Sequence, residues 1–261
     1  MGRNIAALDS LPDPIYIASA IITAGIALLT LMPAMTEIAK MGYNPRYLLV
    51  TGMLLLALFL LTAVISRAAY NNYEGLLAFN TFFLLGMAAC FGLWLSAEIE
   101  KFGHLLPVCI IAAGVDILSV AKGPSSVVVK QIDEHLQYIA AGIAHAPPLA
   151  SFLILRYPQA GSGLAMMIGV GDLAFFAILA GIIVKMKLPR INILLTALFG
   201  FMAVLTSHLL QMAVPALPFI GIGFVLANVK RIHLDRTEWQ ITFGLTLALI
   251  VIGVILALKP G

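Results

Sequence analysis

Long apolar runs dominate this chain and limit what it can fold into. Eight of them can be read directly from the sequence: Ile15–Met32, Tyr47–Ile65, Gly75–Leu95, Leu105–Val120, Leu164–Val184, Ile191–Leu210, Pro215–Val229 and Ile241–Leu258. A helix needs about 20 mostly apolar residues to cross a bilayer. Only 10% of the residues are charged, against about 25% in a soluble domain. We therefore expect an all-α, polytopic transmembrane helical bundle with about eight spans.

The runs are continuous and do not alternate between apolar and polar residues, which argues against the strands of a membrane barrel. We expect one integral membrane domain over residues 1–261, with N-terminal helices in 1–104, a core in 105–230 and an additional C-terminal helix in 231–261. The basic residues gather at the ends of the runs and form no stripe for nucleic acid. The expected partner is therefore the lipid bilayer, not nucleic acid.

The distribution of Lys and Arg predicts the orientation of the chain in the membrane. With eight spans, nine of these residues fall on one side of the bundle: Lys40, Arg46, Lys101, Lys185, Lys187, Arg190, Lys230, Arg231 and Arg236. Six fall on the other side, together with both termini and the long connection between residues 121 and 163. The positive-inside rule then places both termini outside.

Two aspartates stand apart from the other acidic residues. Asp116 lies in the run Leu105–Val120 and Asp172 in the run Leu164–Val184, whereas the other ten of the 12 acidic residues fall in loops, termini or the flanks of runs. A carboxylate inside a membrane helix is costly and persists mainly where it faces a cavity and has a function. Two carboxylates that share one proton can activate a water: one accepts its proton and the other polarises a carbonyl.

Three motifs around these aspartates carry a resemblance to a known family. Gly169-Val170-Gly171-Asp172 resembles the Gly-x-Gly-Asp motif of intramembrane aspartyl proteases. Pro215-Ala216-Leu217-Pro218 resembles the Pro-Ala-Leu motif of the presenilin and signal peptide peptidase family. Asp116 followed by Ala121-Lys122-Gly123-Pro124 is similar to the first catalytic segment of presenilins. The motifs stand in the family's order, so the chain resembles a prokaryotic, presenilin-like member.

The resemblance implies an aspartic endopeptidase with Asp116 and Asp172 as its catalytic pair. Such an enzyme hydrolyses peptide bonds within or near the transmembrane helices of membrane proteins or signal peptides. It needs no cofactor and no metal, and Cys90 and Cys109 show no metal-ligand spacing. It implies a multi-pass protein of a prokaryotic cell membrane, with transmembrane helices as substrates; assembly into a homo-oligomer is left open.

The resemblance also implies which residues line the site: Lys122, Gly169, Gly171, Pro215, Ala216, Leu217 and Pro218. Gly169 and Gly171 would remove side chains where another backbone or the substrate approaches Asp172. The alternative is that these glycines only allow close helix packing. Pro215 and Pro218 lack backbone donors and would leave carbonyls free at the border of the site; the alternative is an ordinary proline-initiated helix.

The connection between the two aspartate runs contains two further segments of interest. Ser125–Tyr138 has amphipathic helical spacing and is expected to lie along the membrane interface. Leu149–Leu155 lies between prolines and is predicted to be extended. It is our candidate strand for pairing with an unwound substrate, so Leu149 and Leu153 join the candidate site residues. The alternative is a loop segment packed on the bundle.

The chain departs from the family pattern in two respects. Val115 stands where the family usually has Tyr before the first aspartate, and three runs precede that aspartate instead of five. Two rival functions therefore stay open. One is a prepilin-peptidase-like protease, in which the Pro-Ala-Leu element is not expected. The other is a transporter in which both aspartates bind protons or cations, although we find no related halves that would favour it.

Overall fold

A computed structural model describes residues 14–68, 74–141, 146–159, 163–210 and 213–258. The described chain is mostly helical. Its α-helices are α1 Pro14–Lys40, α2 Pro45–Ala68, α3 Glu74–Glu98, α4 Leu105–Lys122, α5 Pro124–Ala140, α6 Val170–Lys185, α7 Ile191–Leu210, α8 Leu217–Asn228 and α9 Arg236–Leu258. Two short 3-10 helices, η1 Phe102–His104 and η2 Leu149–Leu153, and two strands, β1 Ile154–Gln159 and β2 Gly163–Gly169, complete it.

Three helical stretches of the described residues are long and apolar enough to cross a membrane: Pro45–Ala68, Ala78–Glu98 and Phe102–Ile132. Ile191–Ser207 and Leu217–Asn228 are apolar but shorter. A helical bundle with membrane-spanning helices is therefore the coarse architecture. The number of spans beyond these three remains a prediction.

The all-α prediction is wrong for the segment before α6. Strands β1 and β2 pair antiparallel, from Ile154 opposite Gly169 to Gln159 opposite Gly163, with a shift in register between Leu155 and Arg156. The apolar run Leu164–Val184 therefore splits, and its helix begins only at Val170. The residues from Gly163 to Gly169 pair with β1, except Met167 at the shift in register, so helix formation is not needed to satisfy their backbone groups.

The predicted strand Leu149–Leu155 is also displaced. Residues 149–153 form η2, in which the Ser151 backbone N–H donates to the Pro148 carbonyl at 3.0 Å. The Ser151 hydroxyl donates to the same carbonyl at 2.7 Å. This local turn closes directly after the proline pair, so the extended chain starts at Ile154 and continues to Gln159.

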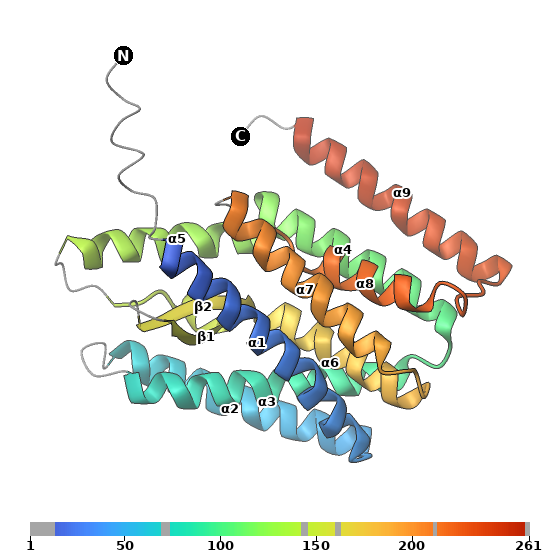
Figure 1. Cartoon of the computed structure of the whole chain (residues 1–261), viewed down its shortest axis with the longest axis horizontal. Helices are drawn as coiled ribbons and strands as arrows, with labels where there is room; N and C mark the ends of the chain where they lie inside the picture. Colours follow the sequence, from blue (N-terminus) through green and yellow to red (C-terminus); the bar gives the residue numbers. More distant parts are fainter. Residues whose placement is uncertain (1–13, 69–73, 142–145, 160–162, 211–212, 259–261) are drawn as a thin grey trace.

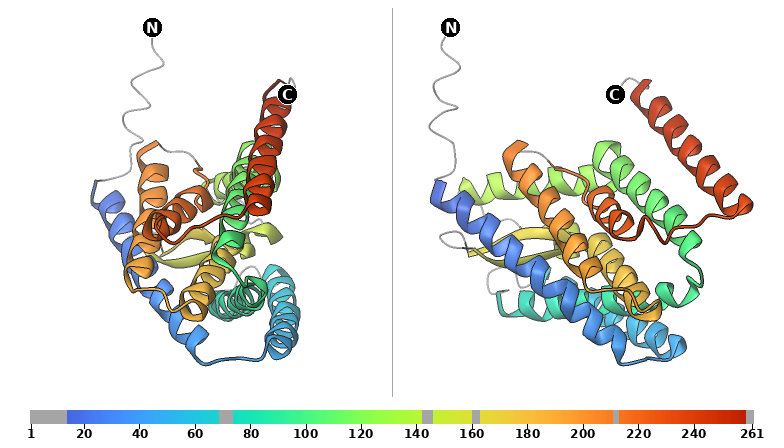
Figure 2. Two further views of the ribbon diagram at one scale, coloured as in Figure 1. Left: turned by 90° about the vertical axis from the view of Figure 1, so that its right-hand side faces the viewer. Right: turned by 45° about the vertical axis from the view of Figure 1, so that its right-hand side comes forward.

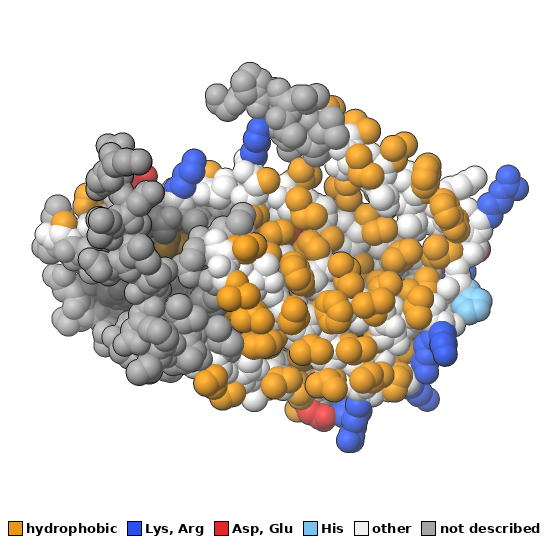
Figure 3. All heavy atoms as spheres, turned by 45° about the horizontal axis from the view of Figure 1, so that its top comes forward, with side chains coloured by type: hydrophobic (Ala, Val, Ile, Leu, Met, Phe, Trp, Pro, Cys, Tyr) orange, Lys and Arg blue, Asp and Glu red, His pale blue; other side chains and the backbone are white. Residues whose placement is uncertain are grey.

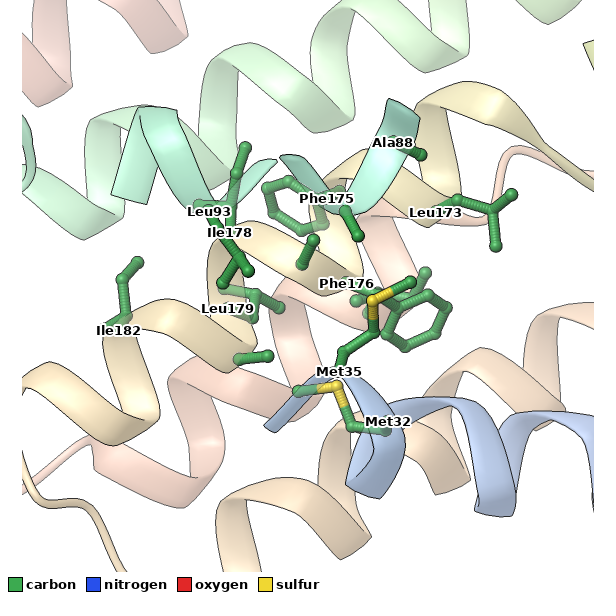
Figure 4. Packing of buried hydrophobic residues seen from close by; sticks show 14 of the residues in the cluster. Met32, Met35, Ala88, Leu93, Leu173, Phe175, Phe176, Ile178, Leu179 and Ile182 are labelled. Atoms are coloured by element: carbon green, nitrogen blue, oxygen red, sulfur yellow. The ribbon is translucent and has the colours of Figure 1, made fainter. Parts of the chain in front are cut away.

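Helix α6 forms the centre of the molecule. Its side chains from Phe175 to Ile183 are all buried, as is Leu173. Figure 4 shows Phe176 close to Met32 and Met35 of α1, and Ile178 close to Leu93 of α3. A helix that is apolar on every side needs apolar surroundings on every side, from protein or from lipid. Helix α6 finds them within the protein by packing against α1 and α3, with smaller contacts to α7 and α8.

A close approach of two helices anchors α6 on α3. Gly92 of α3 lies against the carbonyl of Ala174 and the side chain of Ala177, so closely that even one added methyl group would overlap them. Small residues allow helix backbones to approach in this way. The α3–α6 interface is correspondingly one of the most extensive in the molecule.

The two ends of the bundle differ in character. The hairpin and α5 lie at one end, at the left in Figure 1, and the chain turns after α1, α3, α6 and α8 at the opposite end. Helix α9 lies on the outside, as both views in Figure 2 show, and its main contact is with α4. On the face in Figure 3, apolar side chains cover the middle and most of the visible Lys and Arg side chains lie at the rims.

We expect Gly92→Ala to lower the free energy of unfolding by about 1–3 kcal/mol, because the added methyl group forces α3 away from α6. Thermal unfolding of the detergent-purified protein measures this change. Gly244→Ala in α9 is the matched control: the described structure has nothing within 4 Å of a methyl group there. In an open helical position Ala is favoured over Gly by about 1 kcal/mol, so equal effects of the two substitutions would contradict the packing argument.

Candidate functional site

The structure joins two of the three motifs through a hydrogen bond. Asp116 lies in the second half of α4, and its Oδ2 accepts a hydrogen bond from the Leu217 backbone N–H at 2.9 Å. The two residues are 101 positions apart in the sequence. The Ala216 backbone N–H also interacts with this carboxylate. The Pro-Ala-Leu segment is therefore held directly on Asp116.

This bond also explains where α8 begins. The first backbone N–H groups of a helix have no partner within the helix, and an oxygen acceptor near them stabilises the helix start. Asp116 supplies that acceptor from another helix. The helix starts at Leu217, two residues later than predicted, and Pro218 occupies its first turn, where a missing donor costs nothing. Pro215 and Ala216 precede the helix and are partly buried.

Asp172 lies at the beginning of α6, not in the interior of a long helix. It is the third residue of the helix, and its Oδ2 accepts a hydrogen bond from the Gly169 backbone N–H at 3.3 Å. A carboxylate in the first turn interacts favourably with the positive end of the helix dipole. Strand β2 leads directly into this turn, since it ends at Gly169.

The structure brings the two aspartates together. Their carboxyl groups lie within range of a direct Coulombic interaction, and both residues are partly buried. In each of them a backbone N–H holds Oδ2. Two carboxylates that interact in this way can share one proton, which is what the acid–base chemistry of an aspartate pair requires.

The two glycines before Asp172 border open space. A methyl group on Gly171 would meet nothing within 4 Å in the part of the chain that the structure describes. On Gly169 it would meet only Oδ2 of Asp172, at 3.5 Å. Neither glycine therefore mediates a close helix contact in the described structure, in contrast to Gly92. This favours the first interpretation of the motif, in which the glycines keep the approach to Asp172 free.

An apolar groove of about 250 Å³ runs between α4 and α8, and one end of it lies one helical turn from Asp116. Cys109 and Ala113 of α4 form one wall, and Pro218 and Gly221 of α8 form part of the other. Ala113 lies one turn before Asp116, and Pro218 follows Leu217. The groove therefore reaches the same level of the two helices as the hydrogen bond between Asp116 and Leu217.

Three predicted site residues lie in other surroundings. Lys122 is the last residue of α4 and is exposed. Leu149 and Leu153 are exposed residues of η2, and η2 packs mainly on α2, α3 and α5. The structure does not bring Leu149 and Leu153 to the aspartate pair.

Val115, next to Asp116 in α4, is 57% exposed and leaves the surface beside the pair without an aromatic ring.

The backbone groups that hold the pair could not be predicted from the sequence. The N–H groups of Gly169, Ala216 and Leu217 contact the carboxylates whatever the side chains are, so no residue pattern reports them. The strand before Asp172 did leave a signal, because Gly163–Gly169 is a short apolar run between two glycines.

Neither a cofactor site nor a known relative adds to this picture. Within the described residues, no group of three or more His, Cys, Asp or Glu side chains could hold a metal ion. No protein-family model, curated protein or solved structure matches the chain. The site therefore has to be interpreted from its own geometry.

We expect Asp116→Ala to loosen the start of α8, because it removes the acceptor of the Leu217 N–H. Amide hydrogen exchange of a peptide covering residues 213–220 should become about tenfold faster, the effect of losing one hydrogen bond to a charged group. Asp116→Asn keeps an acceptor oxygen and is the control, with exchange close to that of the wild type. Equal exchange in all three proteins would show that this bond does not hold α8.

Proposed function

We propose that this protein is an intramembrane aspartyl protease of the presenilin-like type, with Asp116 and Asp172 as its catalytic pair. One observation carries the proposal: the Leu217 N–H donates to Asp116, so the Pro-Ala-Leu segment and the first aspartate, 101 residues apart, meet at one point. The second aspartate interacts with the first at the same place. Three motifs that resemble those of one family are therefore joined in space as well as in order.

The chemistry follows from the two carboxylates. They share one proton, so one of them accepts a proton from a water while the other donates a hydrogen bond to the scissile carbonyl. Because the two groups titrate as a coupled pair, we assign the roles to the pair and not to one residue each. The backbone N–H donors on Oδ2 of Asp116 and of Asp172 fix the direction of each carboxylate, and such fixed positions favour catalysis.

The proposed substrate is a transmembrane helix of another protein or a signal peptide. Its scissile carbonyl is hydrogen-bonded within the helix, so the helix has to unwind locally before water can attack. The freed backbone groups then need partners away from water. The hairpin of β1 and β2 is a candidate for this role, because a strand can extend a sheet edge and β2 ends three residues before Asp172. It replaces Leu149–Leu155 in our proposal.

The surroundings of the pair support this substrate class. The groove between α4 and α8 is lined almost entirely by apolar side chains, which suits an apolar peptide. The open space at Gly171 lies one residue from Asp172, where an extended peptide backbone would have to pass. We further propose that residues 105–230 form the catalytic core of a multi-pass membrane protein with about eight spans. The contact between the Pro-Ala-Leu segment and Asp116 favours this type of protease over a prepilin-peptidase-like one.

Cleavage of a reporter transmembrane helix by the purified protein in liposomes tests the proposal. We expect cleavage by the wild type and a loss of at least about a hundredfold in Asp116→Asn and in Asp172→Asn, because each substitution removes an acid–base group. Asn is nearly the same size as Asp, so thermal unfolding should change little. Asp235→Asn, at the start of α9, is a control that should keep full activity.

Two outcomes would contradict the proposal. Cleavage by Asp116→Asn at the normal rate would exclude the pair as the catalytic machinery. Proton or cation flux through liposomes that requires both aspartates, with no cleavage of any reporter helix by the wild type, would favour the transporter instead.

We expect Gly171→Leu to lower cleavage about a hundredfold without changing thermal unfolding. The first carbon of the new side chain would meet nothing within 4 Å in the described structure, but the side chain would occupy the path of the substrate beside Asp172. A displacement of a substrate by about 1 Å can cost this much in rate. Gly244→Leu, also in open space but on α9, should cleave normally. Full activity of Gly171→Leu would show that substrate does not pass this glycine.

A further inference from the structure

A second groove lies at the other end of α6, far along the helix from Asp172. It has a volume of about 680 Å³ and runs between α1, α6 and α7. Its walls are apolar, with Leu29 and Pro33 from α1, Ile183 from α6, and Leu194 and Ala197 from α7. None of the residues that form the candidate protease site lines this groove, so the groove is a separate feature of the molecule.

One end of this groove carries most of its charge. Lys40, Lys187 and Arg190 line it together with a single acidic residue, Glu37. Lys40 and Glu37 form an ion pair at 2.5 Å and neutralise each other. Lys187 and Arg190 therefore leave two net positive charges, and both side chains are exposed. These residues follow α6 and precede α7, at the end of the bundle where the chain also turns after α1 (Figure 1).

The apolar part of the groove is open on both sides. Leu29 and Leu194, on facing helices, are each 53% exposed. An apolar chain that lies between them would cover this exposed apolar surface. The groove therefore has an apolar part that suits a hydrocarbon chain and a basic end that suits an anionic head group. The basic residues follow directly after apolar helices, which is the level at which lipid head groups lie.

We propose that this groove binds one anionic phospholipid, with its phosphate between Lys187 and Arg190 and an acyl chain between α1 and α7. The net charge at the basic end selects the occupant, because basic pockets between transmembrane helices bind anionic head groups. A zwitterionic lipid would bring a quaternary ammonium group to the same two cations. The proposal requires that the bundle lies in a membrane, but it does not depend on protease activity.

The test uses the full chain, purified in an uncharged detergent and titrated with dioleoyl phosphatidylglycerol. We expect the lipid to raise the unfolding temperature, whereas dioleoyl phosphatidylcholine at the same concentration has little effect. In Lys187→Gln/Arg190→Gln, the phosphatidylglycerol concentration for half the effect should rise about thirtyfold, the loss expected for two basic residues near a lipid surface. Native mass spectrometry should show one tightly bound phosphatidylglycerol in the wild type and none in this variant.

The matched control is Lys230→Gln/Arg231→Gln. It removes the same two charges from exposed positions at the same end of the bundle, after α8 and outside the groove. The control should bind phosphatidylglycerol like the wild type. Leu194→Trp, at an exposed position of the apolar wall, should weaken lipid binding without removing any charge.

Three results would overturn the proposal. Equal losses in Lys187→Gln/Arg190→Gln and in the control would mean that the lipid senses only overall charge. Equal stabilisation by glycerol 3-phosphate would identify the ligand as a soluble anion. Unchanged binding by Leu194→Trp would show that no acyl chain enters the groove. Because these measurements record lipid binding, they stand apart from the cleavage assay, and failure of one proposal leaves the other untouched.

Discussion

The burial of α6 on all sides is the constraint on which the rest of the structure depends. Its side chains from Phe175 to Ile183 are fully enclosed, and α1 and α3 provide most of the enclosure. A helix held this tightly has little freedom to rotate or shift, because interiors are close-packed. Asp172 is the third residue of this helix, so its position follows from the packing of the core and not from a flexible loop.

The candidate site uses the unpaired ends of helices. Helix α8 begins with an N–H group that has no partner of its own, and Asp116 accepts it. The first turn of helix α6 contains Asp172, which accepts the N–H of Gly169 at the end of β2. Groups that every helix leaves unsatisfied thus orient both carboxylates. A pair of carboxylates inside an apolar bundle becomes possible because backbone donors stabilise each of them.

Most residues of the candidate site could be predicted from the sequence, but their arrangement in space could be predicted only in part. Asp116, Asp172 and the segment from Pro215 to Pro218 were predicted to belong together, and the structure joins them. Leu149 and Leu153 were predicted to contact substrate as part of a strand, and they lie in a 3-10 helix away from the pair. Proline spacing predicts that a helix stops, but only the pairing of β1 with β2 decides which residues become extended.

The sequence by itself determined the apolar helices, the amphipathic helix after Pro124 and the isolation of two aspartates from all other acidic residues. These features depend on local composition and spacing, which each segment carries within itself. Only the tertiary structure decided where α6 begins, that Asp116 supports α8, and that basic residues from the end of α1 and from the turn between α6 and α7 meet at one groove. Those features depend on contacts between distant segments. An apolar run can pack against many other apolar runs, because the hydrophobic effect is not directional, so only the packing of the whole core decides which helices are neighbours.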